Sequence, residues 1–155
     1  MIRILGFRGL AVGLFAACAA MVAAPAAQAD PTGAMSPLTA VTGQGTGMVI
    51  VSPTSAGMGS FVAQVKVNIH DAAPNTTFAI TRAVAAPDSG CANPTPFIQV
   101  ATLTTSAGGA GAVEFERRGT GPLSFDLILQ VNGSDGTVLQ SECMTIIGKP
   151  PPATA

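Results

Sequence analysis

The sequence contains no tryptophan and no tyrosine, one histidine, and only 10% charged residues. Because Trp, Tyr and Arg dominate the energetic centres of protein interfaces, little surface of that kind is available. The net charge is −1 at pH 7, and without Arg3 and Arg8 the chain carries five basic residues against eight acidic ones. No basic face is therefore expected for nucleic-acid phosphates, and no cationic patch for anionic lipids. The composition disfavours nucleic-acid binding.

A complete catalytic or metal-ligating set is also missing. His70 and Asp71 could form half of a triad, but the sequence designates no nucleophile and no third group. Neighbouring residues of a strand point to opposite faces, so we expect His70 to be exposed at a strand end and turned away from Asp71. A copper site would need a second histidine, so we assign Met48, Met58 and Met144 to packing.

Four carboxylates could be considered as the pair that glycoside hydrolysis requires: Glu114, Glu116, Asp126 and Glu142. All four lie at positions that we expect to face outward on strands, where a solvated surface is the ordinary explanation. We predict that the protein is not an enzyme and has no catalytic residue, no metal site and no cofactor.

Other polar motifs are also interpreted structurally. Asp135 resembles part of a calcium loop, but the remaining ligand spacing is missing, so we expect a hairpin turn. Arg117 and Arg118 are expected to form a small solvated positive spot. Asn75 and Asn132 match the glycosylation pattern, and we assign no sugar to either.

The first 29 residues have the pattern of a secretory signal peptide. Arg3 and Arg8 precede an apolar, uncharged run over 10–24, and Ala27-Gln-Ala29 fits the small-x-small cleavage rule. We therefore expect secretion with cleavage after Ala29, possible association with the cell envelope, and no stable membrane span afterwards. Lipidation of Cys18 in place of this cleavage stays open as an alternative.

Two cysteines, Cys91 and Cys143, remain after cleavage. An exported protein meets an oxidising compartment, so we predict one disulfide between them. The bridge ties a Pro/Gly-rich loop to the expected last strand.

Alternating hydrophobicity predicts an all-β fold, and the stretch from Ser60 to Val84 shows it best. Apolar residues occupy every second position from Phe61 to Ile69, the turn-forming segment 71–75 follows, and β-rich composition resumes at Thr77. Further strands are expected over 47–51, 97–104, 112–117, 123–131 and 137–146, with a turn at 132–136. The strand over 47–51 is expected to be short, to stop at Ser52-Pro53 and to lie at a sheet edge.

About seven strands argue for an antiparallel, Ig-like β-sandwich over residues 47–147, with a small barrel as the second choice. Residues 30–46 show little periodicity and are expected to be a flexible leader. Residues 148–155 are expected to be a Pro-rich tail.

Several segments resemble the neocarzinostatin-type apoproteins, which are small secreted sandwiches that carry a chromophore in a cleft. The resemblance covers about residues 60–118, through Val65-Lys-Val, Pro74-Asn-Thr-Thr-Phe, Cys91-Ala-Asn-Pro and the run from Thr104 to Arg118. That family has two short-range disulfides, whereas Cys91 and Cys143 are far apart. The resemblance implies the fold more strongly than any ligand.

We therefore expect a secreted binding module that acts on a protein or on a cell-envelope partner. The alternative is a carrier of a small apolar ligand, and a secreted hydrolase is the least favoured class. A carrier would need an apolar pocket of about 300 Å³ or more, which distinguishes the first two hypotheses. The sequence does not identify the residues that bind the ligand.

Overall fold

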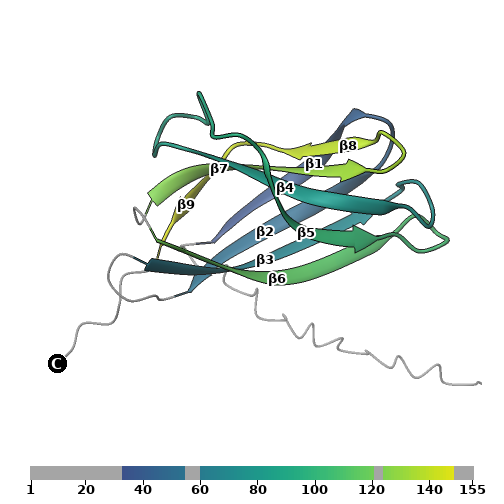
Figure 1. Cartoon of the computed structure of the whole chain (residues 1–155), viewed down its shortest axis with the longest axis horizontal. Helices are drawn as coiled ribbons and strands as arrows, with labels where there is room; N and C mark the ends of the chain where they lie inside the picture. The colour runs from purple at the N-terminus through teal and green to yellow at the C-terminus, as the bar shows by residue number, and fades with distance from the viewer. Residues whose placement is uncertain (1–32, 55–59, 121–123, 149–155) are drawn as a thin grey trace, which may run out of the picture.

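The computed structural model describes residues 33–54, 60–120 and 124–148, and these residues form an antiparallel, all-β structure (Figure 1). The predicted signal peptide lies outside the described residues, as does the predicted tail apart from Gly148. The strands are β1 (Ala34–Thr42), β2 (Thr46–Thr54), β3 (Ser60–His70), β4 (Thr77–Ala85), β5 (Ile98–Thr104), β6 (Gly111–Thr120), β7 (Ser124–Gly133), β8 (Val138–Ser141) and β9 (Met144–Ile147). The described residues contain no helix long and apolar enough to cross a membrane.

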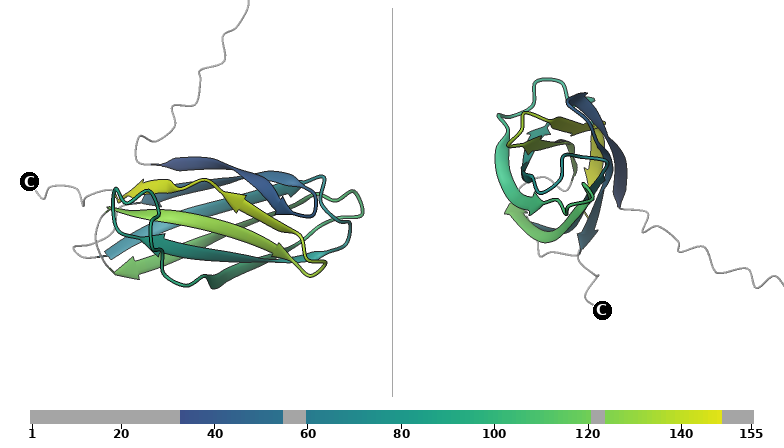
Figure 2. Two further views of the ribbon diagram at one scale, coloured as in Figure 1. Left: turned by 90° about the horizontal axis from the view of Figure 1, so that it is seen from above. Right: turned by 90° about the vertical axis from the view of Figure 1, so that its right-hand side faces the viewer.

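The strands form one sheet in the order β5-β4-β7-β8-β1-β2-β3-β6, and β9 pairs with β7. The sheet curls until its two edge strands, β5 and β6, lie side by side (Figure 1). No backbone ladder joins these two edges in the part of the chain that the structure describes, so the sheet is a nearly closed barrel. The view along the barrel shows the ring of strands (Figure 2).

The predicted alternation of apolar residues is confirmed by burial. On β3, Ala63, Val65, Val67 and Ile69 are all at most 5% exposed, whereas Lys66 and Asn68 between them are exposed. Side chains of the same kind from β2, β4 and β7 complete the core. Because a small barrel of about eight strands is just wide enough for such side chains, most of the interior is filled.

The two strands of the stretch 60–84 exist as expected, but they do not pair with each other. β3 pairs with β2 and β6, whereas β4 pairs with β5 and β7. The connection over 71–76 therefore crosses from one side of the barrel to the other. Left-handed backbone at Asp71 and Asn75, with φ of 57° and 50°, confirms the predicted turn chemistry.

The flexible leader predicted over 30–46 is wrong for its described part. Ala34–Thr42 is β1, which lies between β2 and β8 and contributes the buried Leu38. Its periodicity is weak because Ser36 and Leu38 are its only buried side chains. Pro37 is tolerated because the ladder to β8 begins at Leu38, which leaves that side of β1 unpaired at the proline.

β2 also differs from expectation, since it is an inner strand and continues through Pro53 to Thr54. The ladder with β1 ends at Val51 in the described residues, so on that side Pro53 lies beyond the last described pair. The predicted count of seven strands is too low because β1 was missed and the segment 137–146 forms two strands, β8 and β9.

Candidate ligand-binding cavity

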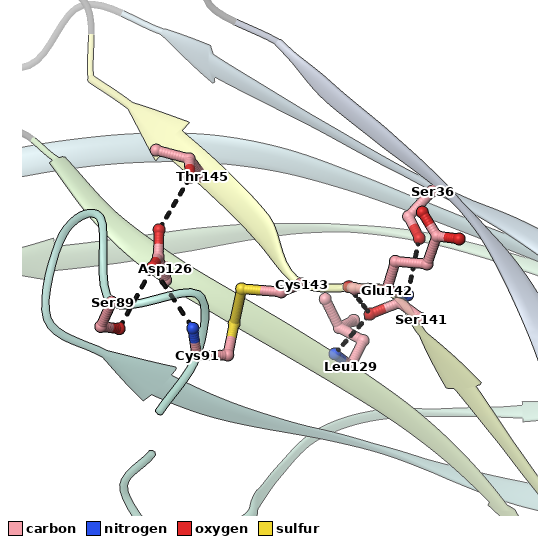
Figure 3. The surroundings of a disulfide bond; sticks show 9 residues. All are labelled: Ser36, Ser89, Cys91, Asp126, Leu129, Ser141, Glu142, Cys143 and Thr145. Carbon is pink, nitrogen blue, oxygen red and sulfur yellow. Dashed lines mark hydrogen bonds between the residues drawn. A yellow bond between two sulfur atoms is a disulfide. The ribbon is translucent and has the colours of Figure 1, made fainter. Parts of the chain in front are cut away.

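The predicted disulfide is confirmed, with Cα atoms of Cys91 and Cys143 5.8 Å apart (Figure 3). Cys91 lies in the loop between β4 and β5, as expected. Cys143, however, lies between β8 and β9 and not on a continuous last strand. Serine hydroxyls replace ladder bonds at this break: the Leu129 N–H donates to Ser141 Oγ at 3.0 Å, and the Glu142 N–H donates to Ser36 Oγ at 2.9 Å.

Asp126 lies beneath the same loop and is fully buried, which contradicts the expected outward, solvated position. Its carboxylate accepts hydrogen bonds from the Thr145 hydroxyl at 2.8 Å, the Ser89 hydroxyl at 3.2 Å and the Cys91 N–H at 3.4 Å (Figure 3). These donors, led by Thr145, hold the pKa of Asp126 below its usual value, although burial acts in the opposite direction. Asp126 therefore anchors the disulfide loop to β7.

The two cysteine sulfurs and the Asp126 carboxylate lie within 4.8 Å of one another, a spacing that could suit a metal. Both sulfurs are bonded in the disulfide, whereas the metal ligand is a free thiolate. Under oxidising conditions these residues therefore connect the loop after β4 to the segment between β8 and β9. The absence of a metal cofactor stays a prediction.

The other carboxylates considered above are dispersed on the surface. Glu114 pairs with Lys66 at 3.2 Å and Glu116 with Arg118 at 2.7 Å, and Glu142 is exposed. The Asp135 carboxylate accepts the N–H and the hydroxyl of Thr137 in the turn before β8. The arrangement at Asp135 is that of the predicted hairpin turn.

His70 is exposed at the end of β3, as predicted, but it is not turned away from Asp71. The left-handed backbone of Asp71 brings its carboxylate to 2.7 Å from His70 Nδ1. The Thr46 hydroxyl lies 3.2 Å from both ring nitrogens, beside the ring and not in line with Nε2. The histidine and aspartate side chains are 60% and 81% exposed, so this group lacks the in-line geometry and the enclosure of a catalytic triad.

A cavity of about 500 Å³ opens at one end of the barrel. It is lined by residues from the starts of β3, β5 and β7, from the ends of β4 and β6, and from the loop between β4 and β5. Apolar side chains dominate the lining, including Phe61, Val84, Pro96, Ile98 and Phe125. The rings of Phe61 and Phe125 have their centroids 5.1 Å apart and are tilted by 43°. Gly119 leaves room for this pair, because a Cβ at that position would collide with the Phe61 ring.

A second, smaller cavity of about 40 Å³ continues toward the core. It shares Phe61, Arg82 and Phe125 with the large cavity and adds Arg117 and Arg118. Burial, followed by the like charge of Arg117, lowers the pKa of Arg82 from its usual value. Three arginines therefore border an otherwise apolar space, and of these Arg118 is paired with Glu116.

No protein-family model matches this chain, and a search of curated proteins returns no matching sequence.

The cavity residues were not predicted from the sequence, and Arg117 was expected on the solvated surface. Arg118 does lie there, with 77% of its side chain exposed, but Arg117 is half-buried. The signal for Arg117 was present in the strand pattern: Val113 and Phe115 were expected to point inward, and the next inward position is Arg117. Arg82 follows Phe78 and Ile80 in the same way on β4.

Proposed function

We propose that this chain is an exported, non-enzymatic binding protein that carries a small apolar ligand in the cavity at the end of its barrel. The observation that carries the proposal is the apolar cavity of about 500 Å³. Ligand sites in proteins usually occupy about 300–1,000 Å³ and are lined mostly by apolar and aromatic side chains. The volume also exceeds the value of about 300 Å³ that we required of a carrier.

The cavity is built largely from ordered strands, which favours a preformed site. Phe61, Arg82 and Val84 lie on β3 and β4, and Phe125 lies on β7. The loop that contributes Pro96 is tied to the barrel by the disulfide and by the bonds to Asp126. A preformed site loses less conformational entropy when a ligand binds.

The resemblance to neocarzinostatin-type apoproteins is in keeping with a carrier. Segment 60–118, over which the resemblance runs, contributes Phe61, Arg82, Pro96 and Ile98 to the cavity. An Ig-like relationship between this barrel and those sandwiches stays a prediction.

Export is part of the proposal and is supported by the disulfide. Disulfides persist in oxidising compartments and are rare in the cytosol of most organisms. The pairing of Cys91 with Cys143 therefore agrees with the N-terminal pattern of Arg3, Arg8 and Ala27-Gln-Ala29, which lies outside the described residues.

Binding to a neutral apolar fluorophore, N-phenyl-1-naphthylamine, tests the carrier function. The protein contains no Trp and no Tyr, so the measured emission would come from the fluorophore alone. We expect saturable binding by the wild type and a several-fold loss in Ala86→Phe, because Ala86 lines the cavity and is exposed at its rim. Ala92→Phe is the matched control, since Ala92 is exposed in the same loop and does not line the cavity.

Absence of saturable binding in the wild type would overturn the carrier proposal. Equal binding by Ala86→Phe and Ala92→Phe would also overturn it, because the fluorophore would then occupy another surface. Either result would favour the other hypothesis, a secreted module that binds a protein or a cell-envelope partner.

A further inference from the structure

We propose that the ligand of this cavity is an amphiphile with a carboxylate head group, and that Arg82 and Arg117 bind this head group inside the barrel. The inference rests on the proposed function, because it specifies the chemistry of the ligand in the same cavity.

Both arginines lie at inward positions of their strands. On β4 the buried Phe78 and Ile80 precede Arg82 at intervals of two residues. On β6 the half-buried Val113 and Phe115 precede Arg117 in the same way. Side chains at intervals of two share a face, so each arginine occupies a position where the pattern would otherwise place an apolar residue.

Neither arginine has a hydrogen-bond or ion-pair partner among the residues that the structure describes. The Nε atom of Arg117 is buried and unpaired within this part of the chain. In contrast, the outward-facing Lys66 and Arg118 each pair with a carboxylate. Buried donors in native proteins almost always have partners, so the unpaired Nε of Arg117 in the wall of a cavity indicates a missing acceptor.

The electrostatics favour an anion as that acceptor. Burial and the neighbouring Arg117 charge both lower the pKa of Arg82, so its charged form is destabilised in the ligand-free protein. A negative group between the two guanidinium groups would offset both the desolvation and the mutual repulsion. A neutral polar group could accept hydrogen bonds but would leave the repulsion in place.

The shapes of the two cavities suggest how such a ligand would lie. The inner cavity of about 40 Å³ has Arg117 in its wall and suits a compact carboxylate, which a guanidinium group binds with two parallel hydrogen bonds. The outer cavity of about 500 Å³ is apolar and is bordered by Pro96 and Ile98. Arg82 lines both cavities, so the head group would lie at their junction and the apolar chain would extend toward the mouth.

The test compares dodecanoate, dodecyl phosphate and dodecanol as competitors of N-phenyl-1-naphthylamine on the full-length exported protein. We expect dodecanoate to bind at least about tenfold more tightly than dodecanol, as a charge-assisted hydrogen bond implies. Dodecyl phosphate should bind less tightly than dodecanoate because its head group is larger than the inner cavity favours.

Arg82→Met and Arg117→Met should each remove most of the preference for dodecanoate and leave dodecanol binding unchanged or tighter. Retained dodecanol binding also shows that each variant is folded. Lys66→Gln is the matched control, because it removes one positive charge from the outer face, where Lys66 is 57% exposed. We expect it to behave as the wild type.

Equal affinities of the wild type for dodecanoate and dodecanol would overturn the head-group inference while leaving the carrier function intact. An equal loss of dodecanoate binding in Lys66→Gln and the arginine variants would also overturn it, because the attraction would then be a general charge effect. Tighter binding of dodecyl phosphate than of dodecanoate would overturn the inference as stated, because the preferred head group would then be a phosphate and not a carboxylate. Failure of both dodecanol and dodecanoate to displace the bound fluorophore would also overturn the head-group inference, whereas failure of the fluorophore itself to bind would overturn the proposed function.

Discussion

Among the described residues, Asp126 is buried and Arg82 and Arg117 are half-buried, and the surroundings of the carboxylate and of the two arginines differ. Asp126 is fully buried on the outer side of β7 and accepts hydrogen bonds from Ser89, Cys91 and Thr145. Arg82 and Arg117 face the cavity without such partners among the described residues. A buried charge that has hydrogen-bond partners within the protein stabilises the fold. A charge that borders a cavity without such partners is a candidate for binding a ligand.

The Asp126 network makes stability depend on pH in a defined direction. Because the folded-state pKa of Asp126 is depressed, its contribution is fully present above the unfolded value and is lost as the pH falls through the lower folded value. We expect the Tm of the wild type to fall steeply below about pH 4. Asp126→Asn should lower Tm at pH 7 by roughly 5 °C. In this variant Tm should also fall less between pH 4 and pH 2 than it does in the wild type.

Thermal melts from pH 2 to pH 7 measure this effect. Asp88→Asn is the matched control, since Asp88 is exposed in the loop that Asp126 anchors. If Tm falls by the same amount at acid pH in the wild type and in Asp126→Asn, the pH dependence does not come from Asp126. Asp135 also has a lowered pKa, through its bonds to Thr137, and would then be the next carboxylate to examine.

At the scale of elements, β1 is the strand that was not predicted from the sequence, although it contributes to the core. Leu38 is 1% exposed, whereas Val41 on the same strand is 61% exposed. We expect Leu38→Ala to lower the free energy of unfolding by about 2–5 kcal/mol, because it leaves a void in a packed core. Val41→Ala should change it by less than about 0.5 kcal/mol.

Urea unfolding followed by circular dichroism measures both variants. Equal stabilities would mean that β1 does not pack on the barrel and that residues 30–46 act as a leader after all.

The disulfide connects the loop after β4 to the break between β8 and β9, two segments 52 residues apart in the sequence. The loop over 86–97 has few buried side chains, so packing alone holds it weakly. Replacing Cys91 or Cys143 by Ser should lower stability by about 2–4 kcal/mol, mainly because the unfolded chain gains freedom. Reduction of the wild type with dithiothreitol should give the same loss in a denaturant melt.

Two alkylatable thiols in the untreated exported protein, or a covalent dimer on a non-reducing gel, would show that the pairing does not form in the mature protein.

The sequence predicted the strands whose alternation reflects one buried face, and failed where other factors decide. β3, β6 and β7 were recognisable because Val65, Phe115 and Leu127 belong to regular inward rows. β1 was missed because it has one large buried side chain and contains Pro37. The sequence did not predict which strands pair with each other. Alternation shows which side chains of a strand point inward, but not which strand lies next to it. The cavity was missed for a related reason: its residues come from strands that meet only when the barrel forms.

At the scale of the whole molecule, the cavity follows from incomplete closure of the barrel. β5 and β6 are joined by a short turn and lie side by side, but no ladder links them in the described residues. β5 begins at Ile98, whose partner Arg82 lies three residues before the end of β4. The edge of the barrel is therefore shorter at this end, and the core side chains beneath it line a cavity.

Export is the prediction that concerns the whole chain. The basic residues Arg3 and Arg8, the apolar run over 10–24 and the small residues Ala27 and Ala29 predict cleavage after Ala29, four residues before β1 begins at Ala34. Cleavage there would leave β1 intact, so the mature protein could form the full sheet. Mass spectrometry of the protein from culture supernatant should show a chain that starts at Asp30 and is two hydrogens lighter than its reduced form, because the disulfide has formed. A version expressed from Asp30 in a reducing cytoplasm is the control, and it should contain both thiols and melt at a lower temperature until it is oxidised. Recovery from the cytoplasm of a chain that still starts at Met1, or of a secreted chain modified at Cys18, would refute cleavage after Ala29.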